Sequence, residues 1–156
     1  MHPFRHAIAT PQKAAVIVAE TGAVTTYAEL DAASNRVAQL LRAKGLNAGD
    51  RIALLIENVP EFYALIWGAQ RAGLLFICIS TKLTTSEIDY ILTDSSAAVL
   101  VASASLAAVA EPLSTSAARY SLSGDIAGFA SWDDIVRNMP ATPIADETAG
   151  TGMLYS

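Results

Sequence analysis

Three short apolar runs alternate with helical segments along the middle of the chain, and this alternation constrains the fold more than any other feature. The runs cover residues 51–56, 74–79 and 97–102. A continuous apolar run of this length is typical of a strand that is covered on both faces, as in a parallel sheet. Parallel strands joined by single helices need right-handed crossovers. The sequence therefore predicts an α/β fold, with a Rossmann-like, mostly parallel sheet flanked by helices.

Helix start signals separate these runs. Two of them are Thr-x-x-Glu capping boxes, in which the hydroxyl and the carboxylate each bind a backbone N–H that the first helical turn leaves unpaired. A third is a proline, which is tolerated in the first turn of a helix. The fourth is a Ser-x-x-Asp pattern. The four predicted starts are at Thr26, Pro60, Thr84 and Ser131.

The regions on either side give weaker signals. Residues 14–26 predict a β-hairpin, because two β-branched runs flank turn residues. A short helix over 106–109 and a weak strand near 119–122 are expected further along. The last residues, 149–156, run into an apolar strand without a closing turn or helix. We therefore expect one α/β unit over residues 1–156 that is truncated at its end.

Composition argues against several classes of protein. The chain has 10 Lys+Arg against 15 Asp+Glu, a formal net charge of −5, and no basic run of the kind that binds phosphate backbones. We expect no nucleic-acid partner. The longest apolar run, 72–79, is far shorter than the roughly 20 residues of a membrane-spanning helix. No secretory leader pattern is visible, so we expect no membrane span and a cytoplasmic location.

The reactive residue types form no complete catalytic set. His2 and His6 could share a helix face around a metal, but no third ligand lies near them, and a mobile, solvated terminus is the stronger expectation. Cys78 stands among apolar neighbours, which favours a buried core thiol. The sequence therefore predicts no catalytic residue and no metal ligand.

Acidic and aromatic groups suggest structural roles. Asp146 and Glu147 are adjacent in sequence, so their side chains point in different directions, and we expect solvated charge. Trp67 lies at helical spacing from Phe62 and Tyr63, without interleaved basic residues. These aromatics are expected in the core rather than on a base-stacking surface.

Several short blocks follow one another at defined spacing. They are 24–30 (VTTYAEL), 33–41 (ASNRVAQLL), 45–55 (GLNAGDRIALL), 58–62 (NVPEF), 69–73 (AQRAG), 83–87 (LTTSE), 90–95 (YILTDS) and 153–156 (MLYS). Their order and spacing resemble the N-terminal part of fatty-acyl and aryl-CoA synthetases, which belong to the adenylate-forming (AMP-binding) superfamily. The resemblance covers nearly the entire chain.

This resemblance implies an ATP-dependent ligase that activates a carboxylic acid, with a fatty acid as the preferred substrate. The acid and ATP form an acyl-adenylate with the help of magnesium, and coenzyme A then displaces AMP. In such enzymes the loop that grips the phosphates begins where a segment like 153–155 ends, so Ser156 would be its first residue. The remaining nucleotide, magnesium and acyl-binding groups follow further along. The resemblance thus implies that these 156 residues alone are inactive.

Lys82 is the other position at which the resemblance implies ligand contact. Some CoA ligases hold a basic residue there, near the ribose phosphate of the coenzyme. This chain reads Ser80-Thr-Lys-Leu83 where relatives read Asn-Pro-Arg-Leu. Lysine supplies a point charge rather than a two-pronged guanidinium. A solvated loop lysine is the alternative.

Two further expectations concern association and class. A domain cut from a larger sheet exposes apolar surface where the missing elements would pack, so we expect a homo-oligomer that covers this surface. The alternative to the ligase is a complete, non-enzymatic α/β module, which would bind a small ligand or a partner at the carboxyl ends of its strands.

Overall fold

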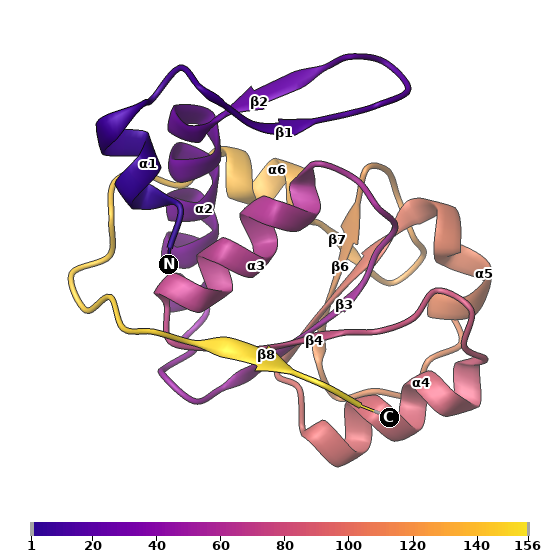
Figure 1. The fold of residues 1–156 in the computed structure, drawn as a ribbon. Helices are drawn as coiled ribbons and strands as arrows, with labels where there is room; N and C mark the ends of the chain where they lie inside the picture. The colour runs from indigo at the N-terminus through magenta and orange to yellow at the C-terminus, as the bar shows by residue number, and fades with distance from the viewer. Residues whose placement is uncertain (1, 156) are drawn as a thin grey trace.

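Strand β3 (Arg51–Leu55) is the centre of the sheet in a computed structural model of the chain, which describes residues 2–155. It pairs in parallel with β4 (Leu75–Cys78) on one side and with β5 (Val99–Ser103) on the other. The outer strands are β6 (Ala118–Leu122), β7 (Ala130–Ser131) and β8 (Thr151–Met153). The strand order is β7-β6-β5-β3-β4-β8, and all five pairings are parallel (Figure 1). The predicted parallel α/β sheet is confirmed.

Helices cover both faces of this sheet (Figure 1). One face packs against α2 (Tyr27–Ala43), α3 (Glu61–Arg71) and α6 (Trp132–Arg137). The other packs against α4 (Thr85–Ser95) and α5 (Ala107–Ala110), which a single 3₁₀ turn, η1 (Ala104–Leu106), precedes. No helix in the described part of the chain is long and apolar enough to cross a membrane.

The side chains of β3 supply both hydrophobic cores. Ile52 and Leu54 lie in the core under α2 and α3, whereas Ala53 and Leu55 lie in the core under α4. Alternate residues of a strand point to opposite faces, so a strand with helices on both sides needs apolar residues at every position. This explains why the sequence of β3 shows no polar alternation.

The N-terminal region forms a separate small unit on α2. Strands β1 (Ala14–Ile17) and β2 (Val24–Thr26) pair antiparallel, as the sequence predicts. They follow α1 (Phe4–Ala9), a helix that the sequence analysis did not predict. Figure 1 shows α1 against α2, with the hairpin extending beyond the end of that helix.

The four predicted helix starts are confirmed, because α2, α3, α4 and α6 each begin at the residue that follows Thr26, Pro60, Thr84 or Ser131. The hydroxyl of Thr26 accepts a hydrogen bond from the Glu29 backbone N–H, and the Glu29 carboxylate accepts one from the Thr26 N–H at 2.8 Å. The Thr26 hydroxyl also donates to the Glu29 carboxylate at 2.9 Å, and the bonds that this carboxylate accepts, the one from the backbone N–H first, lower the pKa of Glu29. The box at Thr84 has the same design. Helix α3 begins directly after Pro60. The sequence alone predicts the capping boxes, because the two residues of each box lie within one helical turn.

Two stretches differ from the prediction. The run 74–79 is not fully buried, because β8 pairs with β4 only from Leu75 to Ile77 and leaves the end of β4 open. The short helix expected over 106–109 is divided into η1 and α5. The strand expected near 119–122 is β6, which begins one residue earlier.

Removal of one central side chain tests this core. We expect Leu54→Ala to lower the free energy of unfolding by about 2–5 kcal/mol, because Leu54 is 1% exposed and its loss leaves a cavity. Urea titration measures the change. The matched control is Leu154→Ala at a 93% exposed position, which should alter the value by less than about 0.5 kcal/mol. Equal losses in the two variants would contradict the assignment of the core.

Candidate functional site

The chain reverses its direction across the sheet at β3. Helix α3 carries the chain from β3 to β4 along one face, and α4 carries it back past β3 to β5 along the other. Such a reversal leaves a crevice at the carboxyl ends of the strands, where open α/β sheets bind ligands. A cavity of about 480 Å³ lies at the carboxyl ends of β3 and β4, next to this reversal; it is lined by Ile56, Glu57, Asn58, Phe62, Cys78, Ile79, Ser80 and Thr81.

Glu57 is the acidic group of the crevice. Its backbone N–H donates to the Ser103 hydroxyl at 3.2 Å, and its carboxylate accepts a hydrogen bond from the Ser105 hydroxyl at 2.7 Å. Ser103 ends β5 and Ser105 lies in η1, so these bonds hold Glu57, the second residue after β3, against the end of the neighbouring strand. Glu57 can therefore accept a hydrogen bond from a ligand at a defined position.

Cys78 also lines the crevice, and the prediction of a buried core thiol is wrong. The side chain is exposed, because it follows the last residue of β4 that β8 covers. It also lines an apolar groove of about 480 Å³ with Leu83, Tyr90 and Tyr155. Partial burial in this setting raises the pKa of the Cys78 thiol. The neutral thiol is a weak nucleophile, so the site does not activate Cys78.

Lys82 lies in the turn between β4 and α4, beside the crevice. It is exposed, and its backbone N–H donates to the Ser80 hydroxyl at 3.3 Å. Ser80 and Thr81 line the cavity, whereas Lys82 is outside the described lining. Ser156, the other residue predicted to contact a ligand, lies outside the described residues. Within residues 2–155, the structure has no cluster of three or more His, Cys, Asp or Glu side chains that could hold a metal ion.

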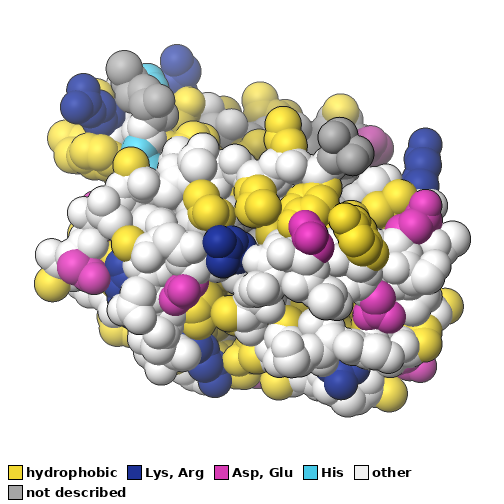
Figure 2. All heavy atoms as spheres, turned by 90° about the horizontal axis from the view of Figure 1, so that it is seen from below, with side chains coloured by type: hydrophobic (Ala, Val, Ile, Leu, Met, Phe, Trp, Pro, Cys, Tyr) yellow, Lys and Arg dark blue, Asp and Glu magenta, His cyan; other side chains and the backbone are white. Residues whose placement is uncertain are grey.

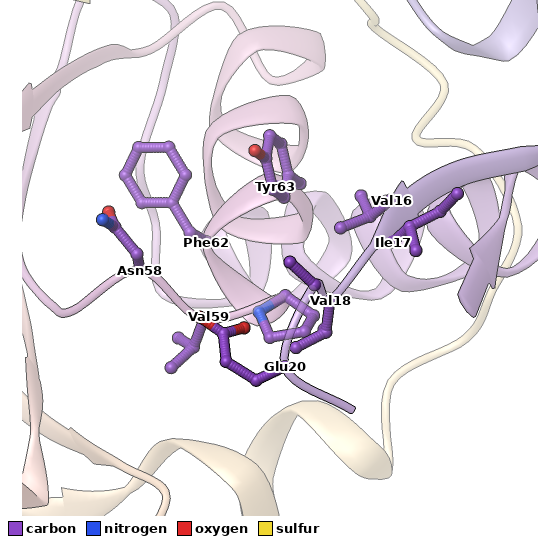
Figure 3. Close-up of a pocket in the computed structure, with 10 residues that line it drawn as sticks. Val16, Ile17, Val18, Glu20, Asn58, Val59, Phe62 and Tyr63 are labelled. Carbon is purple, nitrogen blue, oxygen red and sulfur yellow. The ribbon is translucent and has the colours of Figure 1, made fainter. Parts of the chain in front are cut away.

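A smaller cavity of about 260 Å³ adjoins this crevice. It lies between the hairpin and the first turn of α3, and its lining includes Val18 and Glu20 of the hairpin and Asn58, Phe62 and Tyr63 around the start of α3 (Figure 3). Asn58 and Phe62 line both cavities. Glu20 supplies the only charge in the described lining.

The N-terminal histidines differ from their prediction. His2 is half-buried, its ring lies edge-on to Trp67 at 5.1 Å, and its Nε2 is 3.3 Å from the Trp67 carbonyl oxygen. Its Nδ1 accepts a hydrogen bond from the Phe4 backbone N–H. Burial lowers the pKa of His2. The expectation of a solvated terminus is therefore wrong for His2, whereas His6 is exposed.

The predicted aromatic core is also only partly present. Phe62 packs against the core under α3, but Tyr63 is 41% exposed and Trp67 is half-buried beneath His2. Helical spacing alone cannot place these side chains, because α3 has an N-terminal segment packed along one of its edges.

Sequence reasoning missed a buried charge at the end of α3. The Arg71 side chain is 3% exposed and lies 2.6 Å from Asp31 and 3.4 Å from Glu147. The neighbouring Asp146 pairs with Arg42 at 3.0 Å. The acidic pair Asp146 and Glu147 is therefore not simply solvated. An arginine among small residues in the block 69–73 was the available sequence signal.

A parallel sheet covered by helices on both faces, with a cavity at the carboxyl ends of its strands, is typical of Rossmann-like domains. Within that class, a family model described as AMP-binding enzyme matches residues 4–141. The chain belongs to this family.

Individual relatives agree with this assignment. The long-chain-fatty-acid–CoA ligase FadD13 of Mycobacterium tuberculosis is 32% identical over 151 residues, which are 97% of this chain and 30% of that protein. A feruloyl-CoA synthase from Amycolatopsis sp is 37% identical over 99 residues, which are 64% of this chain and 20% of that protein. The chain thus spans less than a third of the length of these relatives.

Solved structures show the same fold. A fatty acyl CoA synthetase from Mycobacterium tuberculosis superimposes with a TM-score of 0.83 at 30% identity, over 99% of this chain and 31% of that one. An anthranilate CoA ligase has a TM-score of 0.84 over 96% of this chain and 30% of its own; at 22% identity this likeness shows the fold alone.

The reactivity of Cys78 tests the description of the crevice. Because burial raises the thiol pKa, we expect the rate of alkylation by iodoacetamide to reach half its limit at a higher pH in the folded chain than in the same chain unfolded in urea. Mass spectrometry follows the reaction, and the sequence has one cysteine, so the signal is unambiguous. A midpoint at or below that of the unfolded chain would mean that the site activates the thiol.

Proposed function

We propose that these residues form the first α/β layer of an acyl-CoA synthetase. The enzyme would activate a carboxylic acid, with a fatty acid as the preferred substrate, to an acyl-adenylate and then transfer it to coenzyme A. The observation that carries this proposal is the match of 97% of the chain to a long-chain-fatty-acid–CoA ligase. We propose that residues 1–156 are one α/β unit, the N-terminal portion of a larger AMP-binding domain.

The position of β8 supports this proposal. Strand β8 runs parallel to β4, so its carboxyl end lies at the same edge of the sheet as the crevice (Figure 1). Residues that follow Tyr155 would therefore enter the site at this edge. We propose that Ser156 begins the loop that grips the phosphates of ATP. Backbone amides in such a loop stabilise the charge that develops during phosphoryl transfer.

Magnesium would accompany ATP, and the proposal assigns it no ligand within this chain. For coenzyme A, the charge of Lys82 at the crevice edge suits a phosphate group. Glu57 lies in the same crevice, and its charge would favour a hydroxyl or amide donor over a second phosphate. Lys82 and Glu57 would thus orient opposite ends of a polar ligand.

Association and location complete the proposal. Leu154 and Tyr90 are 93% and 65% exposed, and Figure 2 shows further hydrophobic side chains at the surface of one face, with acidic and basic side chains among them. Exposed apolar patches favour association, so we propose a homo-oligomer that covers such a surface. The proposed location is the cytoplasm, where ATP and coenzyme A are available.

A chimera tests the proposed function. In it, this chain replaces the aligned 151-residue region of the Mycobacterium tuberculosis ligase. We expect the chimera to form acyl-adenylate from a long-chain acid, because the two folds superimpose over nearly the whole chain. ATP–pyrophosphate exchange measures the reaction, with the intact ligase as positive control. A folded chimera without exchange would contradict the proposal.

The 156-residue chain by itself should behave differently. We expect no pyrophosphate release above a heat-inactivated control with ATP, magnesium and a panel of carboxylic acids, because the proposed phosphate-gripping loop only begins at Ser156 and its backbone amides would stabilise the transferring phosphorus. Turnover by the chain alone would show that it carries a site of its own.

The role of Lys82 can be measured in the chimera. We expect Lys82→Glu to raise the KM for coenzyme A about tenfold and to leave the KM for ATP unchanged, because the substitution replaces attraction to phosphate with repulsion. Lys13→Glu is the matched control, since Lys13 is an exposed lysine at the base of the hairpin. An unchanged KM for coenzyme A would leave Lys82 as a solvated loop residue.

A further inference from the structure

Two arginines from neighbouring helices hold the segment that leads into β8. Arg42 on α2 lies 3.0 Å from the Asp146 carboxylate, and Arg71 on α3 lies 3.4 Å from the Glu147 carboxylate. Asp146 and Glu147 are adjacent in sequence, so their side chains diverge, and each reaches a different arginine. We call these four residues the arginine clamp.

Burial makes Arg71 the stronger half of the clamp. Its Nη2 donates to Asp31 at 2.6 Å, and its Nη1 donates to the Asn35 side-chain oxygen, so α2 pairs two edges of the guanidinium. The buried Nε finds no hydrogen-bond acceptor among the described residues. The carboxylate of Glu147 is the charge that faces this remaining edge. Asp31 already pairs with the buried guanidinium, and Glu147 adds a second anion at the one edge that α2 leaves open.

Arg42 links the same segment to two helix ends. Its Nη1 donates to the Leu46 carbonyl and its Nη2 to the Ala72 carbonyl, each at 2.9 Å. Leu46 follows α2 and Ala72 caps α3. The guanidinium therefore has fixed partners on three sides, and Asp146 binds a group that cannot easily move.

Backbone hydrogen bonds connect the segment held by the clamp to β8. The amides of Thr148 and Gly150 donate to the carbonyls of Arg71 and Gln70, at 3.1 and 2.7 Å. The bridge between Ala72 and Thr148 has the same register as the β4–β8 ladder. A side chain at Gly150 would collide with the Leu74 backbone, so only glycine allows this approach.

The register determines where the end of β8 points. In the observed register, Met153 packs on the core under α4, and the Tyr155 hydroxyl donates to Asp94 at 2.8 Å. A slip of one residue would turn every side chain of β8 to the opposite face. A strand of three residues has few ladder bonds with which to resist such a slip.

We propose that Arg42 and Arg71 are positioning residues, which fix the register of β8 through Asp146 and Glu147. The clamp thereby sets where the chain after Tyr155 enters the crevice edge. Its effect on catalysis rests on the proposed function, in which the phosphate-gripping loop begins there. The effect of the clamp on the register of β8 is independent of the proposed function.

Hydrogen exchange tests the clamp in the 156-residue chain. We expect Asp146→Ala combined with Glu147→Ala to speed exchange at the amides of Thr148, Gly150 and Thr151 roughly fivefold or more. In the unmutated chain, two ion pairs must break before this segment can open, and in the double variant these ion pairs are absent. Amides of β3 should be unaffected, which shows that the variant is folded. Asp134→Ala is the control, because it removes an exposed pair with Arg137 on α6. Unchanged exchange at all three amides would overturn the proposal.

The chimera tests the consequence for catalysis. The double variant should raise the KM for ATP severalfold in pyrophosphate exchange while the KM for the acid stays constant, and Asp134→Ala should change neither. Faster exchange in β8 with an unchanged KM for ATP would overturn the catalytic role of the clamp and leave its role in the register. An inactive unmutated chimera would contradict the proposed function instead, and the exchange result would still decide the clamp.

Discussion

The hydrogen bonding of β3 to a parallel strand on each side is the constraint on which the structure depends. Once β3 is flanked by β4 and β5, both of its faces must be covered, which requires helices on opposite sides of the sheet. The crossover through α3 runs from β3 to β4 on one face, and the crossover through α4 runs from β4 past β3 to β5 on the other, so the candidate site lies at the carboxyl ends of these strands. Fold and candidate site thus have one origin.

The elements that could be predicted from sequence are those set by neighbours along the chain. The partners in the capping boxes at Thr26 and Thr84 lie within one helical turn of each other. The apolar runs indicate strands that are buried on both faces. The exposure of Cys78 could not be predicted, because it depends on where β8, which is distant in sequence, ends its pairing with β4. The buried position of Arg71 likewise depends on acids from α2 and from the segment before β8.

The candidate site likewise has features that the sequence predicts and features that it does not. The crevice at the carboxyl edge follows from topology, and Lys82 lies beside it as its sequence position between a strand and a helix suggests. Glu57 was missed because its position depends on serines at the end of β5. The fold alone would permit many functions. The family assignment comes from sequence similarity across nearly the whole chain, and the structure shows how those residues build the parallel sheet and the crevice at the carboxyl ends of its strands.

Native-state hydrogen exchange in increasing urea tests the central role of β3 most directly. If β3 organises the sheet, amides of residues 52–55 exchange only by global unfolding, with a free energy equal to that from urea denaturation, and the amides of edge strands β7 and β8 exchange at lower free energies. Exchange of β3 through a local opening, while β7 or β8 remains protected, would contradict the account.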